Sequence, residues 1–116
     1  MQTPSYNQFQ GTILAGGTLT AQPFNVEGYT TFGLMATTSS VNGTLNFLVN
    51  DTPDVNSGNW KQVYGSTGAA VTVTINSGKT AISSDALTSL HGYKYLHIKS
   101  TAQPNGLALT LTAKAD

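Results

Sequence analysis

Apolar and polar residues alternate along most of the chain. Phe32, Leu34 and Ala36, for example, fall on one side of an extended segment. Successive side chains of a β-strand point to opposite faces, so a period of two predicts half-buried strands. The same alternation recurs over 44–49, 71–75, 93–100 and 107–111. Helical periodicity is confined to one expected short turn over Asp85–Leu90, which Ser84 would cap.

Turn-forming residues separate these segments. Asn42-Gly43 stands between the segments 29–36 and 44–49 and predicts a β-hairpin joining them. The stretch Asn50–Asn59 is a loop by its Asn, Asp, Pro and Gly content. About eight short strands in one sheet would leave an apolar face exposed. We therefore predict an all-β fold, an antiparallel β-sandwich that is jelly-roll-like.

The first ten residues are polar, and only Tyr6 and Phe9 among them offer aromatic side chains. We expect residues 1–10 to form an arm that is flexible alone or ordered against a neighbouring subunit. In that arrangement Tyr6 and Phe9 would contact the neighbour, either within an added strand or as a hydrophobic anchor. Residues 11–116 would form a single β-sandwich domain.

The composition restricts the partners. Only 9% of the residues are charged, against about 25% in an average soluble domain, and the net charge is zero. A chain without Arg or excess positive charge lacks the features that bind nucleic acid. No apolar run approaches the roughly 20 residues of a membrane helix, so neither nucleic acid nor a membrane is expected as a partner. Protein interfaces, in contrast, are depleted in charge at their centres.

Little in the sequence suggests catalysis or a cofactor. His91 and His97 are the only histidines, and there is no Cys for a thiolate metal site. The loop carries Asp51 and Asp54, but its spacing does not match a calcium-binding loop and no Glu closes it. Whether this loop binds an ion stays open. A G-x-S-x-G nucleophile motif is also absent. We expect no enzymatic activity and no cofactor.

Three side chains of the segment 93–100 share the face opposite Leu96 and Ile98. These are Tyr93, Tyr95 and His97. Aromatic side chains on an outer strand face are suited to two roles, a platform for glycans or a contact between subunits. The residues alone leave both roles open.

The order of elements resembles a family of small structural proteins of tailed bacteriophages. The resemblance begins at about residue 18 and rests on core periodicity and one recognisable segment. The matching parts are Phe24–Leu34, Leu45–Val49, the aromatic pair Trp60 and Tyr64, Val71–Ile75, and Leu90–Ser100 with its Gly-Tyr-Lys-Tyr sequence. Arginines usual in the family are absent or replaced by Lys, and the loop Asn50–Asn59 is longer. The resemblance implies a β-sandwich virion component, and it carries over no catalytic residue.

The expected function is that of a non-enzymatic bacteriophage virion protein. The first hypothesis is a capsid decoration (cementing) protein that binds the head surface as a homo-oligomer, with a trimer favoured. Its partners would be the major capsid protein or other virion proteins, and it would reside in the virion after assembly in the host cytoplasm. The alternative is a tail, fibre or head-surface adhesin that binds host glycans through Tyr93, Tyr95 and His97.

Overall fold

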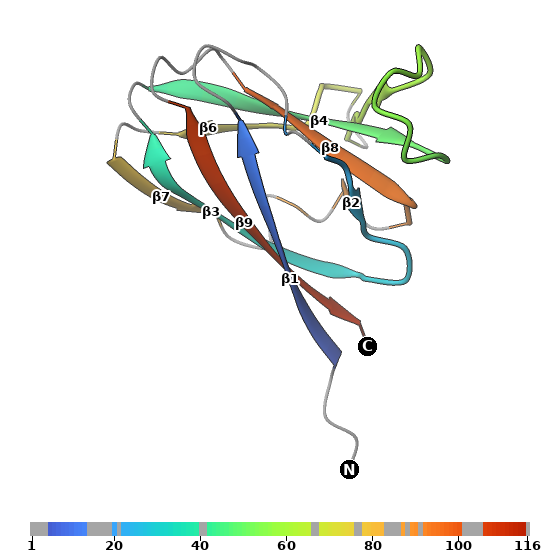
Figure 1. Ribbon diagram of the computed structural model, residues 1–116, viewed down its shortest axis with the longest axis horizontal. Coiled ribbons are helices and arrows are strands. Elements are labelled where there is room, and N and C mark those ends of the chain that lie inside the picture. Colours follow the sequence, from blue (N-terminus) through green and yellow to red (C-terminus); the bar gives the residue numbers. More distant parts are fainter. Residues whose placement is uncertain are drawn as a thin grey trace.

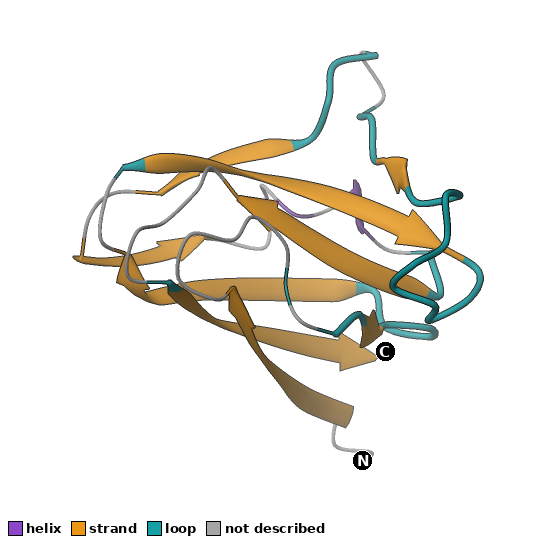
Figure 2. Ribbon diagram, turned by 45° about the horizontal axis from the view of Figure 1, so that its top comes forward, coloured by secondary structure: helices purple, strands orange, loops and turns teal. Residues whose placement is uncertain are grey.

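The computed structural model describes residues 5–13, 20, 22–39, 42–65, 68–75, 78–82, 87, 89–90, 92–100 and 106–115. Nine strands lie in this part of the chain, and every pairing between them is antiparallel. They form two sheets that face each other (Figure 1). Figure 2 shows the same strands as two layers with loops at their ends. The predicted all-β sandwich is confirmed.

The strands divide between a four-stranded and a five-stranded sheet. The four-stranded sheet has the order β1 (Ser5–Ile13), β9 (Leu107–Ala115), β3 (Thr31–Ser39) and β7 (Gly78–Ile82). The five-stranded sheet has the order β2 (Phe24–Asn25), β8 (Tyr95–Ser100), β4 (Gly43–Asn50) and β5 (Lys61–Gln62), and β6 (Thr72–Ile75) also pairs with β4.

The pairings are nested along the chain. Strand β1 pairs with β9, β2 with β8, β3 with β7, and β4 with β6. The chain therefore runs as one long hairpin folded over itself, with β5 inserted near its tip. This nesting across two sheets is the jelly-roll arrangement.

The core lies between the two sheets and is built from the inward half of each alternating strand. Phe32 of β3 and Phe47 of β4 come from opposite sheets and are almost fully buried. The inward positions predicted from the alternation in β3, β8 and β9 are confirmed. The buried apolar residues are Ile13, Phe24, Val26, Phe32, Leu34, Ala36, Leu45, Phe47, Val63, Val73, Ile75, Leu87, Leu90, Leu96, Ile98, Leu107, Leu109, Leu111 and Ala113.

The predicted hairpin at Asn42-Gly43 is wrong. Strand β3 lies in the four-stranded sheet and β4 in the five-stranded one, so the connection crosses from one layer to the other. Both strands keep their predicted inward faces, because each presents them to the same core from opposite sides. Alternation specifies the buried face of a strand but not its partner.

The prediction of a flexible arm over residues 1–10 is wrong for residues 5–10, and residues 1–4 lie outside the described residues. Ser5–Gln10 belongs to β1, which pairs with β9 from Ser5↔Ala115 to Ile13↔Leu107. Phe9 packs inside its own subunit, with ring centroids 5.7 Å from Phe24 and 6.0 Å from Tyr29. The segment alternates like the other strands, but Gln8 and Gln10 hold outward positions and Asn7 an inward one, so its sequence resembles a polar tail.

Two predicted details fall partly outside the described residues. The side chain of Tyr6 is one of them, although its backbone is in β1. The other is the helical turn over Asp85–Leu90, of which only Leu87, Ser89 and Leu90 are described. Leu87 and Leu90 are fully buried and belong to the core.

Candidate functional site

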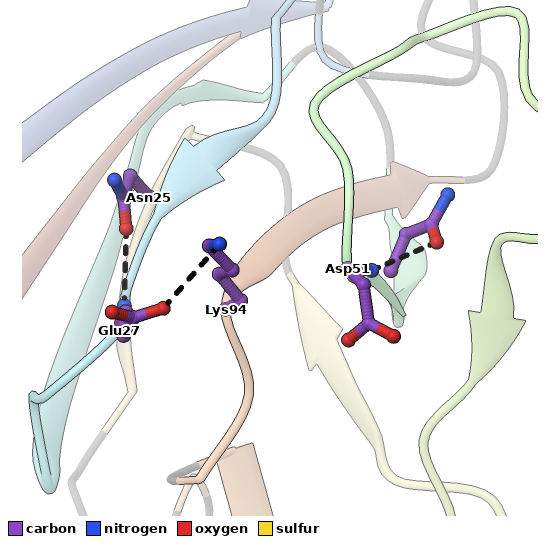
Figure 3. Close-up of polar contacts among 5 residues, drawn as sticks. Asn25, Glu27, Asp51 and Lys94 are labelled. Carbon is purple, nitrogen blue, oxygen red and sulfur yellow. Dashed lines mark hydrogen bonds and ion pairs between the residues drawn. The ribbon is translucent and has the colours of Figure 1, made fainter.

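A depression opens at the end of the sandwich where β4 ends and β8 begins. It has a volume of about 640 Å³. The turn after β2, the end of β4, the start of β5 and the segment entering β8 surround it. Figure 3 shows part of its wall. The polar and aromatic residues that line it are Glu27, Asn50, Asp51, Lys61, Tyr93 and Lys94, together with Asn59.

Charge is concentrated in this depression. The whole chain has only ten charged residues, and four of them are Glu27, Asp51, Lys61 and Lys94. They come from four separate places in the sequence, which the jelly roll brings together. Two carboxylates and two ammonium groups also balance, so the lining carries no net formal charge.

These charges contribute little to stability. Lys94 Nζ and Glu27 Oε2 are 3.8 Å apart, and the two side chains are 47% and 64% exposed. Exposed pairs of this kind contribute about 0–1 kcal/mol at most, because water screens them. Lys94 Nζ also lies 5.8 Å from the centre of the Tyr95 ring.

The rim of the depression is shaped by its backbone. Gly28 and Gly92 have φ angles of 87° and 95°, in the left-handed region that favours glycine. The turn at Gly28 is closed by the Tyr29 N–H, which donates to the Val26 carbonyl at 3.2 Å. Asn25 Oδ1 accepts the Glu27 N–H at 3.2 Å, which fixes the backbone that carries the carboxylate (Figure 3).

Asn50 forms part of the wall, and the NH₂ group of its side-chain amide makes no hydrogen bond within the described part of the chain. Its Oδ1 accepts the Asp51 N–H at 2.8 Å, which fixes the orientation of the side-chain amide. Its Nδ2 is buried and has no hydrogen-bond partner among the described residues. A buried donor without a partner costs about 1–3 kcal/mol.

The predicted platform of Tyr93, Tyr95 and His97 is not an exposed surface. Tyr93 is 37% exposed and lines the depression. Tyr95 is half-buried at the start of β8. His97 is only 2% exposed, and its ring centroid lies 4.9 Å from that of Trp60. The loop that follows β4 brings Trp60 over this strand face, which the local alternation did not reveal.

His97 has a defined hydrogen bond in its buried position. Its Nε2 lies 2.7 Å from the carbonyl oxygen of Thr20. A carbonyl only accepts, so Nε2 carries the hydrogen and Nδ1 is unprotonated in the neutral ring. Burial lowers the pKa of His97 below its usual 6.5, and the bond to Thr20 opposes this by a smaller amount.

The free energy of unfolding should therefore fall as the pH drops below about 6.5. In the unfolded chain the His97 ring takes up a proton at its usual pKa. In the folded chain it does so only at the lower pKa of the buried ring. Stability is therefore lost as the pH falls from the first pKa to the second. Urea unfolding at pH 7.5, 6.5, 5.5 and 5.0 measures this. His97→Gln should reduce the dependence of the unfolding free energy on pH. His91→Gln, which changes the only other histidine, should leave that dependence unchanged. A slope that persists in His97→Gln would contradict the assignment.

In the loop Asn50–Asn59, the polar groups of Asp54 bind nearby residues of the chain. The Asp54 Oδ1 accepts the Asn56 N–H at 2.9 Å, and the Asp54 carbonyl accepts the indole N–H of Trp60 at 2.9 Å. Among the described residues, no three Asp, Glu or His side chains gather as a metal site. His91 lies outside that part of the chain. No helix in the described segments is long and apolar enough to cross a membrane.

The outer face of the four-stranded sheet is almost uncharged. Its outward positions on β1, β9 and β3 form cross-strand rows, such as Gln10–Thr110–Met35 and Gln8–Thr112–Gly33. Met35 is 49% exposed in the middle of this surface. Lys114 is the single charge among the described outward positions of these three strands. We call this surface the Gln/Thr face.

No family model matches the sequence, and no curated protein matches it. Among solved structures, the chain is similar to the SPBc2 prophage-derived protein YomS, with a TM-score of 0.61 at 10% identity. The similarity covers 99% of this chain and 97% of that one. The two proteins share a fold.

Two further solved structures are much less similar. The Yersinia pseudotuberculosis-derived mitogen has a TM-score of 0.35 at 18% identity, covering 98% of this chain and 88% of that chain. A protein of the Bacillus endospore appendages, described as disulfide-linked pili, has a TM-score of 0.35 at 12% identity, covering 99% and 93%. Neither likeness supports an argument about this chain.

Sequence reasoning missed the depression. The sequence marks Glu27 and Asp51 only as carboxylates, and it gives no local reason to single out Lys61 and Lys94. The scarcity of charge could have pointed to the site, because a chain with only ten charged residues has few positions at which charge could serve a function. Their convergence depends on long-range strand pairing, and local patterns do not encode it.

Proposed function

We propose that the chain is a non-enzymatic structural protein of a tailed-bacteriophage virion, a decoration protein that binds the outside of the head. The observation that carries this proposal is the jelly-roll sandwich, which aligns over almost the full length of both this chain and the prophage-derived protein. The order of elements and the Gly-Tyr-Lys-Tyr segment, which resemble small phage structural proteins, favour the same role.

The Gln/Thr face is the proposed contact with the head. Interface centres are depleted in charge, and the described part of this face carries one charge, Lys114, and one exposed Met, Met35. It also spans three adjacent strands, so its backbone is held by pairing on both sides of β9. The occupant we propose is the major capsid protein, or another protein of the head surface.

Edge strand β1 supports the proposal of a homo-oligomer; that the assembly is a trimer stays a prediction from the sequence. Of the described residues outside β9, only Thr20 pairs with β1, at Ile13. The strand has nine residues, SYNQFQGTI, with no charge and no Pro. Charges and Pro are the usual protection of an edge, so this edge is suited to pairing with a second copy.

A charge on the Gln/Thr face should weaken head binding. Thr110→Glu places a carboxylate at its centre, where contact would strip it of water without a cationic partner. We expect at least about a tenfold loss of affinity for heads assembled without this chain, measured by co-sedimentation, which corresponds to about 1.4 kcal/mol. Thr74→Glu, on the outer side of β6 in the other sheet, is the matched control and should bind as the wild type does.

The same assay tests the chemistry of the contact. Neutral contacts should persist in roughly 1 M NaCl, because salt screens only charges. Loss of wild-type binding at moderate salt would contradict a neutral interface. Failure of the wild-type chain to bind heads under any condition would overturn the decoration role.

A further inference from the structure

The depression has the composition of a binding site for an uncharged, hydrogen-bonding ligand. Its two carboxylates and two ammonium groups cancel, so it has no net field to attract an ion. Carboxylates accept hydrogen bonds, ammonium groups donate them, and the side-chain amide of Asn59 does both. A ligand rich in hydroxyl groups satisfies this mixture, since each hydroxyl both donates and accepts.

The aromatic side chain at the rim adds an apolar surface. Tyr93 is 37% exposed and lines the same depression. A tyrosine ring offers an apolar body with a polar end, which suits the C–H face and the hydroxyls of a sugar ring. The volume of about 640 Å³ also lies within the range of roughly 300–1,000 Å³ typical of small-molecule sites.

We propose that this depression binds a neutral saccharide, with Tyr93 as the stacking surface. Asp51 and Glu27 accept hydrogen bonds from its hydroxyls, and Lys94 and Lys61 donate to its oxygens. The side-chain amide of Asn59, which also lines the depression, is a further polar group for the sugar. This site replaces the platform expected from sequence, because Trp60 covers His97 and Lys94 lies beside the Tyr95 ring.

The proposal is independent of head binding. The depression lies at one end of the sandwich, around the entry to β8, whereas the Gln/Thr face is the outer side of β1, β9 and β3. A chain attached to a head by that face would leave the depression free. Because the site is open and its polar groups are hydrated, we expect an affinity on the order of 1 mM.

The test is a titration of the ¹⁵N-labelled full chain with neutral hexoses, N-acetylhexosamines and their disaccharides. Saturable shifts are expected at the backbone amides of Gly28, Asn50 and Gly92. Tyr93→Ala and Asp51→Asn should each weaken binding by at least about tenfold, which is about 1.4 kcal/mol. Tyr93→Phe should retain most of it, because the ring remains.

The matched control is Tyr64→Ala. Tyr64 is 60% exposed and does not line the depression, so its removal should leave the affinity unchanged. Sialylated and sulfated sugars and neutral peptides form the comparison arms. Absence of saturable shifts with every neutral sugar would overturn the proposal, as would stronger binding of the anionic sugars or of peptides. If Tyr93→Ala bound the sugar as tightly as the wild type, the binding site could not be the depression beside Tyr93.

Discussion

Phe47→Ala is expected to lower the free energy of unfolding by about 3–5 kcal/mol. Phe47 is fully buried in β4 and pairs with Ile98 of β8 in the middle of the five-stranded sheet. Its removal leaves a cavity between the two sheets, and β4 cannot easily move to fill it because it pairs with β5, β6 and β8 within its own sheet. Small domains have total stabilities of about 5–15 kcal/mol, so this loss is a large fraction.

Equilibrium unfolding in urea measures the effect through the transition midpoint. Met35→Ala is the matched control, because it also shortens a large apolar side chain but at a position 49% exposed. We expect that change to cost less than about 1 kcal/mol. Similar losses in the two variants would contradict the assignment of the core between the sheets.

Gly11→Val should destabilise the fold by overpacking. A Cβ at Gly11 would lie 2.5 Å from Phe24 Cζ and 3.1 Å from its Cε1. Phe24 is 5% exposed and packs against Phe9, so its ring has little room to move. Overpacked cores lose about 1–3 kcal/mol, and this exceeds the gain in strand propensity of at most about 1 kcal/mol.

Gly33→Val provides the control for this substitution. Gly33 is in β3, and a Cβ at this position would meet no other atom within 4 Å, so the propensity gain should act alone. We expect a neutral or slightly stabilising effect there. Adding Phe24→Leu to Gly11→Val should recover part of the loss, which a double-mutant cycle in urea would show. A stabilised Gly11→Val chain would mean that the two sheets can separate at this point.

The buried faces could be predicted from the sequence because they depend on local alternation. Phe32 and Leu34 face the core, and so do Leu96 and Ile98. The pairing partner of each strand could not be predicted in this way, as the wrongly predicted hairpin at Asn42-Gly43 shows. A turn sequence reverses the chain equally well within a sheet and between sheets, and the choice depends on contacts with strands far away in the sequence.

The candidate site was less accessible to prediction than the fold. Tyr93 was identified as an exposed aromatic residue, and it does line the depression. His97 was placed with it because both lie on alternate positions of one strand, yet Trp60 covers only His97. Whether an outward side chain is exposed depends on whether a loop distant in the sequence packs over it. Glu27 and Lys94 become neighbours only through the pairing of β2 with β8.

The nested pairing also sets a requirement for folding. Strand β9, the last of the strands in sequence, lies between β1 and β3 and holds both. Until β9 has been synthesised, these two strands have no common neighbour, and the backbone edges that β9 pairs with are open. Topologies dominated by such distant pairings fold slowly, because the loop must close before contacts compensate for it. During that interval the uncharged edge of β1 is open to other copies, so newly made chains can associate before each has finished folding.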